Sequence, residues 1–104
     1  MKHGRTVERF DLELPMLIKG VDVKGKSFEE FTKSLNISSG GAYFLIRSQA
    51  RRADSLHTTI SLPRKIRNQV SLDGTIVRVE HLNNNESEKQ GIALQFNSNN
   101  TLMV

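Results

Sequence analysis

Two arginines four residues apart near the start of the chain are the first residues whose type and spacing suggest chemistry. Arg5 and Arg9 project to the same side of the chain, whether this segment is helical or extended. The planar fork of arginine suits phosphate and the O6/N7 edge of guanine, because it donates two parallel hydrogen bonds and its face stacks on a base. The pair therefore indicates recognition of an anionic nucleotide, although two arginines near a terminus more often form a solvated surface.

The polar segment Asn-Ile-Ser-Ser-Gly-Gly offers a second set of groups that suit a nucleotide. Asn36 and Ser38 carry an amide and a hydroxyl, and Gly40 and Gly41 leave backbone N–H groups open to close approach. A Gly-Gly turn between strands is usually only a turn. Neither group of residues identifies a function by itself.

Composition excludes several classes of protein. The chain has 104 residues, the size of one domain, and no cysteine, which excludes disulfide frameworks, zinc ribbons and thiol nucleophiles. Lysine and arginine number 15 against 11 acidic residues, so the net charge of +4 favours anionic partners without naming one. No apolar stretch follows the basic start of the chain, so we expect no export signal, no membrane span and a cytoplasmic location.

Motifs for catalysis and metal binding are missing from the sequence. His3, His57 and His81 do not stand at metal-ligand spacing, and Ser38 lacks the glycine-flanked elbow of a nucleophile. A phosphate loop is also missing. We therefore expect a protein that is not an enzyme and has no catalytic residues, no metal and no cofactor.

Apolar and polar residues alternate over most of the chain, which predicts strands. Residues 10–18 form the clearest strand, with Pro15 at an edge or bulge, and Gly25 marks a hairpin turn before a return strand over 27–37. Phe31, Leu35 and Ile37 share one parity and Phe28 has the other, which favours a bulge near residues 29–30 or, alternatively, a short helical turn.

Four further strands follow from the same periodicity, near residues 42–46, 58–62, 70–79 and 92–96. Residues 47–56 and 81–91 are expected to be loops, and Gly74 lies where the fifth strand loses phase, as a bulge or barrel corner requires. Six strands with little helix predict an all-β, six-stranded antiparallel barrel. We expect a flexible N-terminal arm over 1–9, the barrel over 10–97 and a polar tail over 98–104.

The order of the two polar groups on this background resembles a known family. Arg5-x-x-x-Arg9, followed after two strands by Asn36-x-Ser38-x-x-Gly41, resembles the signature of PilZ domains, the bacterial receptors for the second messenger cyclic di-GMP. The apolar strands GAYFLI and GIALQF also fit that pattern. The resemblance covers residues 5–96, nearly the whole chain.

The resemblance implies a ligand, cyclic di-GMP, and a role for each matched residue. Arg5 and Arg9 grip the guanine bases and phosphates from the arm, while Asn36, Ser38 and Gly41, with the adjacent Gly40, form the second part of the site. Asn36 stands where aspartate is more usual, so it gives up a charge-assisted hydrogen bond to the guanine N–H. We expect the ligand to order the arm, and a downstream partner protein to read the new surface in control of motility, biofilm or exopolysaccharide.

Two other interpretations stay open. The chain could be a degenerate PilZ module that binds a protein and no cyclic di-GMP. It could also be a small nucleic-acid-binding barrel, because basic residues crowd the middle of the sequence: Arg47, Arg51, Arg52, Arg64, Lys65 and Arg67. The one tyrosine and five phenylalanines lie mostly on apolar parity, which leaves few aromatics for base stacking and makes nucleic acid the weaker alternative.

Overall fold

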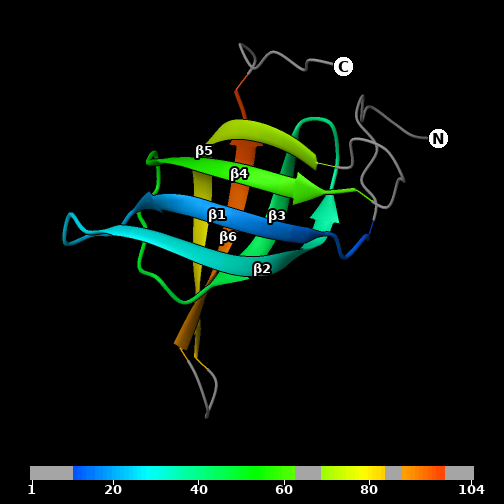
Figure 1. Cartoon of the computed structure of the whole chain (residues 1–104). Helices are drawn as coiled ribbons and strands as arrows, with labels where there is room; N and C mark the ends of the chain where they lie inside the picture. The colour runs from blue at the N-terminus through cyan, green and yellow to red at the C-terminus, as the bar shows by residue number, and fades with distance from the viewer. Residues whose placement is uncertain (1–10, 63–68, 84–87, 98–104) are drawn as a thin grey trace.

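The computed structural model describes residues 11–62, 69–83 and 88–97, which form six strands and no helix. The strands are β1 (Pro15–Val21), β2 (Ser27–Ile37), β3 (Gly41–Ile46), β4 (Ser55–Ser61), β5 (Gln69–Asn83) and β6 (Glu88–Phe96). They close into an antiparallel barrel in the order β1-β2-β3-β6-β5-β4 (Figure 1). The predicted six-stranded barrel is confirmed, while the predicted arm and tail lie outside the described residues.

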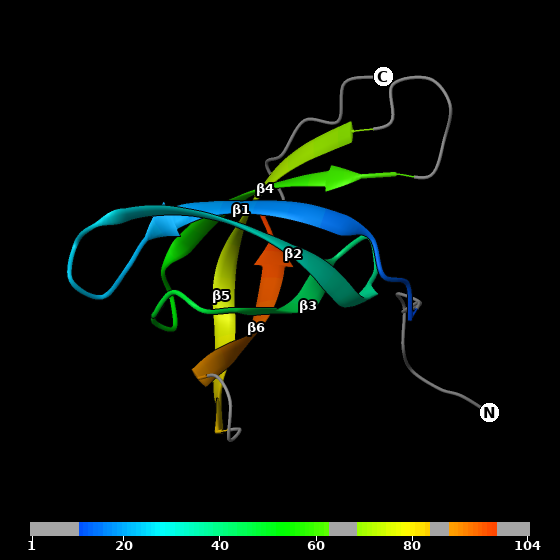
Figure 2. The same ribbon diagram turned by 60° about the horizontal axis from the view of Figure 1, so that its bottom comes forward.

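A tight turn joins β1 to β2 and extends away from the rest of the barrel (Figure 2). Gly25 has a φ of 84°, which glycine adopts at little cost. The Asp22 carboxylate accepts hydrogen bonds from the backbone N–H groups of Lys24 and Lys26, each at 2.9 Å. The bond from Lys26 is the main cause that lowers the pKa of Asp22 below its ordinary value. The predicted turn and the return strand over 27–37 are confirmed.

The first strand begins later than the alternation of residues 10–18 predicts. Pro15 is the first residue of β1, where its missing N–H costs no ladder hydrogen bond. Pro15 pairs with Lys33 on β2, whereas pairing with β4 starts only at Met16, so the expected edge position of this proline is confirmed. Phe10 lies outside the described residues.

The bulge in β2 lies nearer its end than the sequence predicts. The pairing of β2 with β3 shifts between Ser34 and Asn36, so Leu35 is the extra residue, and the bulge predicted near residues 29–30 is wrong. Phe31 is 85% exposed, while Phe28 packs against the core. Polar side chains take the inward positions between Phe28 and the bulge. The apolar residues of the sequence therefore predict the wrong face of β2 as the inward one.

These inward polar side chains all have hydrogen-bond partners. Glu30 accepts hydrogen bonds from the backbone N–H groups of Arg47 and Ser48 at 2.9 and 2.5 Å. The Thr32 hydroxyl donates to the Leu45 carbonyl at 2.7 Å. Because a buried polar group is costly only when it lacks a partner, β2 carries polar residues toward the barrel interior without a large loss of stability.

A second bulge lies in β5, and it too differs from the prediction. The pairing of β5 with β6 shifts between Ile76 and Arg78, so Val77 is the extra residue and Gly74 is not. A Cβ added to Gly74 would meet Leu94 Cγ at 2.6 Å, so this glycine leaves room for core packing. The predicted phase change after Ile76 is confirmed. β5 pairs with β4 up to Thr75 and with β6 from Gly74 onward, so Gly74 lies at the corner where β5 changes partners, as the alternative of a barrel corner predicts.

The two predicted polar loops are shorter in the structure. β4 already begins at Ser55, and β5 and β6 continue their ladder through His81 and Gln90. Gln90 is buried because its amide bonds the backbone of Ala50, accepting from the N–H at 2.8 Å and donating to the carbonyl at 3.3 Å. Polar strand residues such as Gln90 do not produce the alternation of apolar and polar residues that marks a strand. For this reason the sequence predicts a loop over residues 81–91.

The barrel interior is a continuous apolar core. Its largest fully buried apolar side chains come from five strands: Phe44, Met16, Ile18, Ile46, Leu56, Ile76 and Ile92. The core leaves the outer faces of the strands, and the turns between them, to carry function. Within the described residues no helix has the length and apolar character that a membrane crossing needs.

Candidate functional site

Four of the six predicted site residues lie in the turn between β2 and β3 or on the strand residues that flank it. Asn36 lies opposite Tyr43 in the β2–β3 ladder and is half-buried. The Ser38 N–H donates to the Gly41 carbonyl at 2.9 Å, and the Ser38 hydroxyl accepts from the Gly40 N–H at 3.1 Å. The structure therefore brings Asn36, Ser38, Gly40 and Gly41 together in one compact turn, whereas Arg5 and Arg9 lie outside the described residues.

Packing against β6 fixes the position of this turn. The Phe96 N–H donates to the Gly40 carbonyl at 2.9 Å. A Cβ at Gly41 would overlap the backbone carbonyl of Leu94, so only glycine fits there. Gly40 has open space, since the nearest atom to an added Cβ is the Ser38 hydroxyl at 3.8 Å. Gly41 is therefore needed for close packing against β6, whereas Gly40 leaves open space beside the turn.

Ser34 attaches the chain that enters the barrel to the strand that leads into this turn. Its hydroxyl donates to the Leu12 carbonyl at 2.5 Å and accepts from the Leu14 N–H at 3.0 Å, and its own N–H donates to the Leu14 carbonyl at 3.0 Å. Ser34 is fully buried. Sequence reasoning missed this residue, because Ser34 stands on the parity opposite to Phe31, Leu35 and Ile37 and therefore gives no sign of being buried.

The outer face of the barrel continues from Asn36 across three more strands. Tyr43 on β3 pairs with Ala93 on β6, which pairs with Arg78 on β5. The neighbouring residues of β3 and β6 are buried, so by the alternation of a strand this row faces outward. Asn36, Tyr43, Ala93 and Arg78 thus form one row on the outer face, which we call the outer row (strands in Figure 1).

A cluster of three interacting side chains stands on the outer row. The Tyr43 hydroxyl donates to Glu80 Oε1 at 2.6 Å, and Arg78 Nε donates to Glu80 Oε2 at 3.1 Å. The Arg78 guanidinium carbon lies 5.9 Å from the centre of the Tyr43 ring, within reach of a cation–π interaction. A Cβ at Gly91 would overlap the Tyr43 hydroxyl, so this glycine lets the tyrosine cross β6 toward Glu80.

Both titratable partners of this cluster have shifted pKa values. The hydrogen bond from Tyr43, and then Arg78, lowers the pKa of Glu80. Burial, followed by the hydrogen bond to Glu80, raises the pKa of Tyr43. At neutral pH the cluster therefore consists of a neutral phenol, a carboxylate and a guanidinium, with no net charge.

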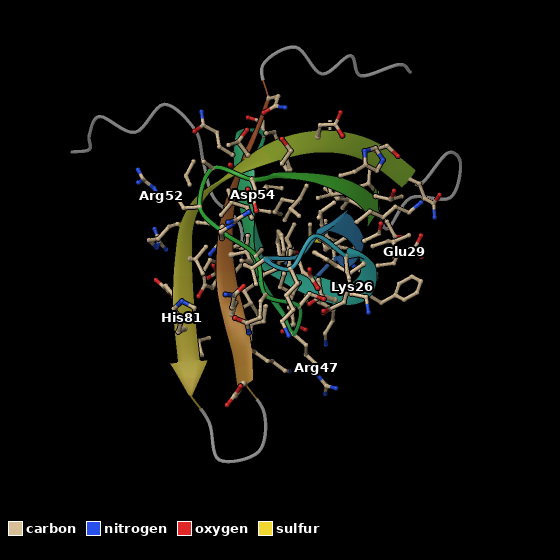
Figure 3. The ribbon with its side chains drawn as sticks, turned by 90° about the vertical axis from the view of Figure 1, so that its left-hand side faces the viewer. Lys26, Glu29, Arg47, Arg52, Asp54 and His81 are labelled. Atoms are coloured by element: carbon tan, nitrogen blue, oxygen red, sulfur yellow. The ribbon has the colours of Figure 1, made fainter. Side chains whose placement is uncertain are left out.

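The basic residues of the β3–β4 loop do not converge on one surface in the part of the chain that is described. Arg47 and Arg52 project in different directions (Figure 3). Arg51 pairs with Asp54 at 3.8 Å, and Arg52 donates to the Val77 carbonyl at 3.3 Å. The other basic residues of the predicted patch, Arg64, Lys65 and Arg67, lie outside the described residues.

Solved structures provide the comparison that identifies the fold. No protein-family model and no curated protein sequence matches the chain. The structure of the Bacillus subtilis inhibitor of motility (MotI/DgrA) matches with a TM-score of 0.70 and 26% identity over 91% of this chain. The PilZ domain of YcgR from Escherichia coli, solved with c-di-GMP, matches with a TM-score of 0.63 and 9% identity over 92% of this chain. The chain has a PilZ-type fold.

This PilZ-type domain corresponds to part of longer proteins in several of its structural neighbours. The K. pneumonia MrkH–c-di-GMP complex matches with a TM-score of 0.65 and 16% identity over 95% of this chain. The chain spans 43% of the MotI/DgrA chain, 47% of the MrkH chain and 79% of the YcgR PilZ domain chain. Identities this low for MrkH and YcgR show a shared fold, and the ligand of this PilZ-type domain must be argued from its own residues.

Proposed function

We propose that this PilZ-type domain is a cyclic di-GMP receptor. The observation that carries the proposal is the turn from Asn36 to Gly41, which β6 fixes in place beside an open outer face. Two of the structural neighbours, MrkH and the PilZ domain of YcgR, were solved with c-di-GMP. This supports a ligand of the same class for the present chain.

The attachment of Leu12 to Ser34 supports a role for the two arginines at this turn. Arg9 lies three positions before Leu12, and an extended chain spans about 3.3–3.6 Å per residue, so Arg9 is tethered within about 11 Å of Leu12. Ser34 lies two residues before Asn36 on the same strand. The covalent chain therefore brings the arginine pair within reach of the turn.

Each site residue supplies a different contact in the proposed complex. Arg5 and Arg9 bind phosphates and guanine edges with charge-assisted hydrogen bonds. The Asn36 amide accepts from a guanine N–H, and the Ser38 hydroxyl, which already accepts from Gly40, keeps its own proton to donate. Gly41 keeps the backbone close to β6, and Gly40 leaves the turn open to the ligand.

The proposed output is an ordered arm that a partner protein recognises. Ordering a short segment costs about 1–2 kcal/mol per residue, which several arginine contacts of about 1–3 kcal/mol each offset in part. The proposed role is that of a receptor without catalysis or a cofactor, acting in the cytoplasm.

Isothermal titration of cyclic di-GMP into the purified protein tests this function, with cyclic di-AMP and GTP as control ligands. We expect saturable binding of cyclic di-GMP alone, lost in Arg5→Ala and Arg9→Ala. Binding should be kept in Lys24→Ala, which removes an equal charge from the exposed turn between β1 and β2, at the other end of β2. Amide hydrogen exchange should slow in residues 1–10 on binding. Absence of binding by protein that circular dichroism shows to be folded would overturn the proposal and favour an interaction module.

A further inference from the structure

The outer row carries a cluster that the proposed site does not yet use. We propose that Arg78, held by Tyr43 and Glu80, forms a base subsite that recognises one guanine of the dinucleotide from the surface of the barrel. This inference rests on the proposed function and adds a third arginine to the site, placed on a strand instead of the arm.

The position of Arg78 suits a ligand with two nucleotide units. Asn36 and Arg78 are the two ends of the outer row, separated by three strand spacings of about 4.8 Å, or about 14 Å. Between them the Tyr43 side chain leans across β6 over Gly91 toward Glu80, and Ala93 contributes only a methyl group, so the part of the face over Ala93 stays low. A dinucleotide that contacts Asn36 with one guanine can therefore lie across this face and reach Arg78 with the other.

The Arg78 side chain has two neighbours on the outer face that restrain it. Glu80 holds Nε at 3.1 Å, and the Tyr43 ring lies beside the guanidinium. The Tyr43 hydroxyl in turn orients Glu80, and Gly91 leaves space for the ring. Because immobilising a long side chain on binding costs free energy, an arginine that is already restrained loses less entropy when it forms a new contact.

The charges of the cluster favour a base over a phosphate. Glu80 is ionised, and its hydrogen bonds from Tyr43 and Arg78 lower its pKa, so it neutralises the Arg78 charge. A neutral pair gives little net attraction for a phosphate. The terminal nitrogens of Arg78 still donate two parallel hydrogen bonds, which match the O6 and N7 acceptors of guanine, and the guanidinium plane can stack on the ring. The side chain is 59% exposed, so these groups are accessible.

Two variants separate the arginine fork from its charge. Arg78→Lys keeps the positive charge and loses the planar fork, and the double variant Arg78→Gln with Glu80→Gln removes both charges and leaves the net charge unchanged. We expect each to weaken cyclic di-GMP binding by tenfold or more in isothermal titration. Lys24→Ala, which removes an exposed positive charge from the turn between β1 and β2, should bind within twofold of wild type. Thermal unfolding midpoints serve as the control for folding.

The outcomes distinguish this inference from the proposed function. Wild-type binding that depends on Arg5 and Arg9 but is unchanged in both Arg78 variants would overturn the base subsite and leave the receptor function standing. Wild-type affinity in Arg78→Lys alone would show that only charge matters, which also overturns base recognition. If the wild-type protein itself does not bind, the proposed function fails first.

Discussion

The hydroxyl of Ser34 donates a hydrogen bond to the carbonyl of Leu12 at 2.5 Å, from a position that is fully buried in the barrel wall. The same oxygen accepts from the Leu14 N–H at 3.0 Å. One small side chain therefore replaces the ladder that β1 lacks before Pro15 and fixes where the chain from the arginine pair meets β2.

Replacement of Ser34 by alanine should destabilise the barrel and loosen this attachment. The change leaves the Leu14 N–H without its side-chain partner, and an unsatisfied buried group costs about 1–3 kcal/mol. We expect a loss of unfolding free energy in that range by urea denaturation, together with faster amide exchange at Leu14. Ser55→Ala, at an exposed strand start, is the matched control and should change stability by less than about 0.5 kcal/mol. Equal stabilities for the two variants would contradict the anchoring role.

The two adjacent glycines of the turn should respond differently to the same substitution. In Gly41→Ala the new methyl group overlaps the Leu94 carbonyl, so the turn must move away from β6, at a cost of about 1–3 kcal/mol. In Gly40→Ala the methyl group meets open space, with the nearest atom 3.8 Å away. We expect a lower thermal midpoint and weaker cyclic di-GMP binding for Gly41→Ala alone. A Gly40→Ala variant that is the less stable of the two would refute this assignment.

The Tyr43–Glu80–Arg78 cluster should make stability depend on pH in the acid range. The hydrogen bond from Tyr43 lowers the pKa of Glu80 in the folded state, so the folded protein holds the carboxylate form more strongly than the unfolded chain does. This contribution is present above the ordinary glutamate pKa of 4.5 and is lost as pH falls through the lower folded pKa. Urea unfolding of wild type and Glu80→Gln from pH 7 to pH 3 should show a constant difference above about pH 5 that shrinks below it. A difference that grows toward low pH would contradict this sign.

The strand number and the turn residues could be predicted from the sequence, because apolar alternation and glycine positions report them directly. Which face of β2 points inward could not be predicted from the sequence. Glu30, Thr32 and Ser34 point inward, and their hydrogen-bond partners lie far along the chain. Phe31 therefore has the parity expected of a core residue and yet is 85% exposed. The outer row was missed for the same kind of reason, since Tyr43 and Glu80 meet only when β6 lies between their strands.

Asn36 is the position where this chain departs from the usual form of the motif, and reversing that difference should strengthen binding. An aspartate would accept the guanine N–H with a full negative charge, and charge-assisted hydrogen bonds are roughly twice as strong as neutral ones. A gain of about 1 kcal/mol corresponds to an affinity about fivefold higher. Asn36→Asp is the test by isothermal titration, with Asn36→Ala as the variant that should bind more weakly than wild type. Because Asn36 is half-buried on the outer face, neither change should alter the thermal midpoint greatly. Weaker binding by Asn36→Asp than by wild type would mean that Asn36 does not accept from the guanine.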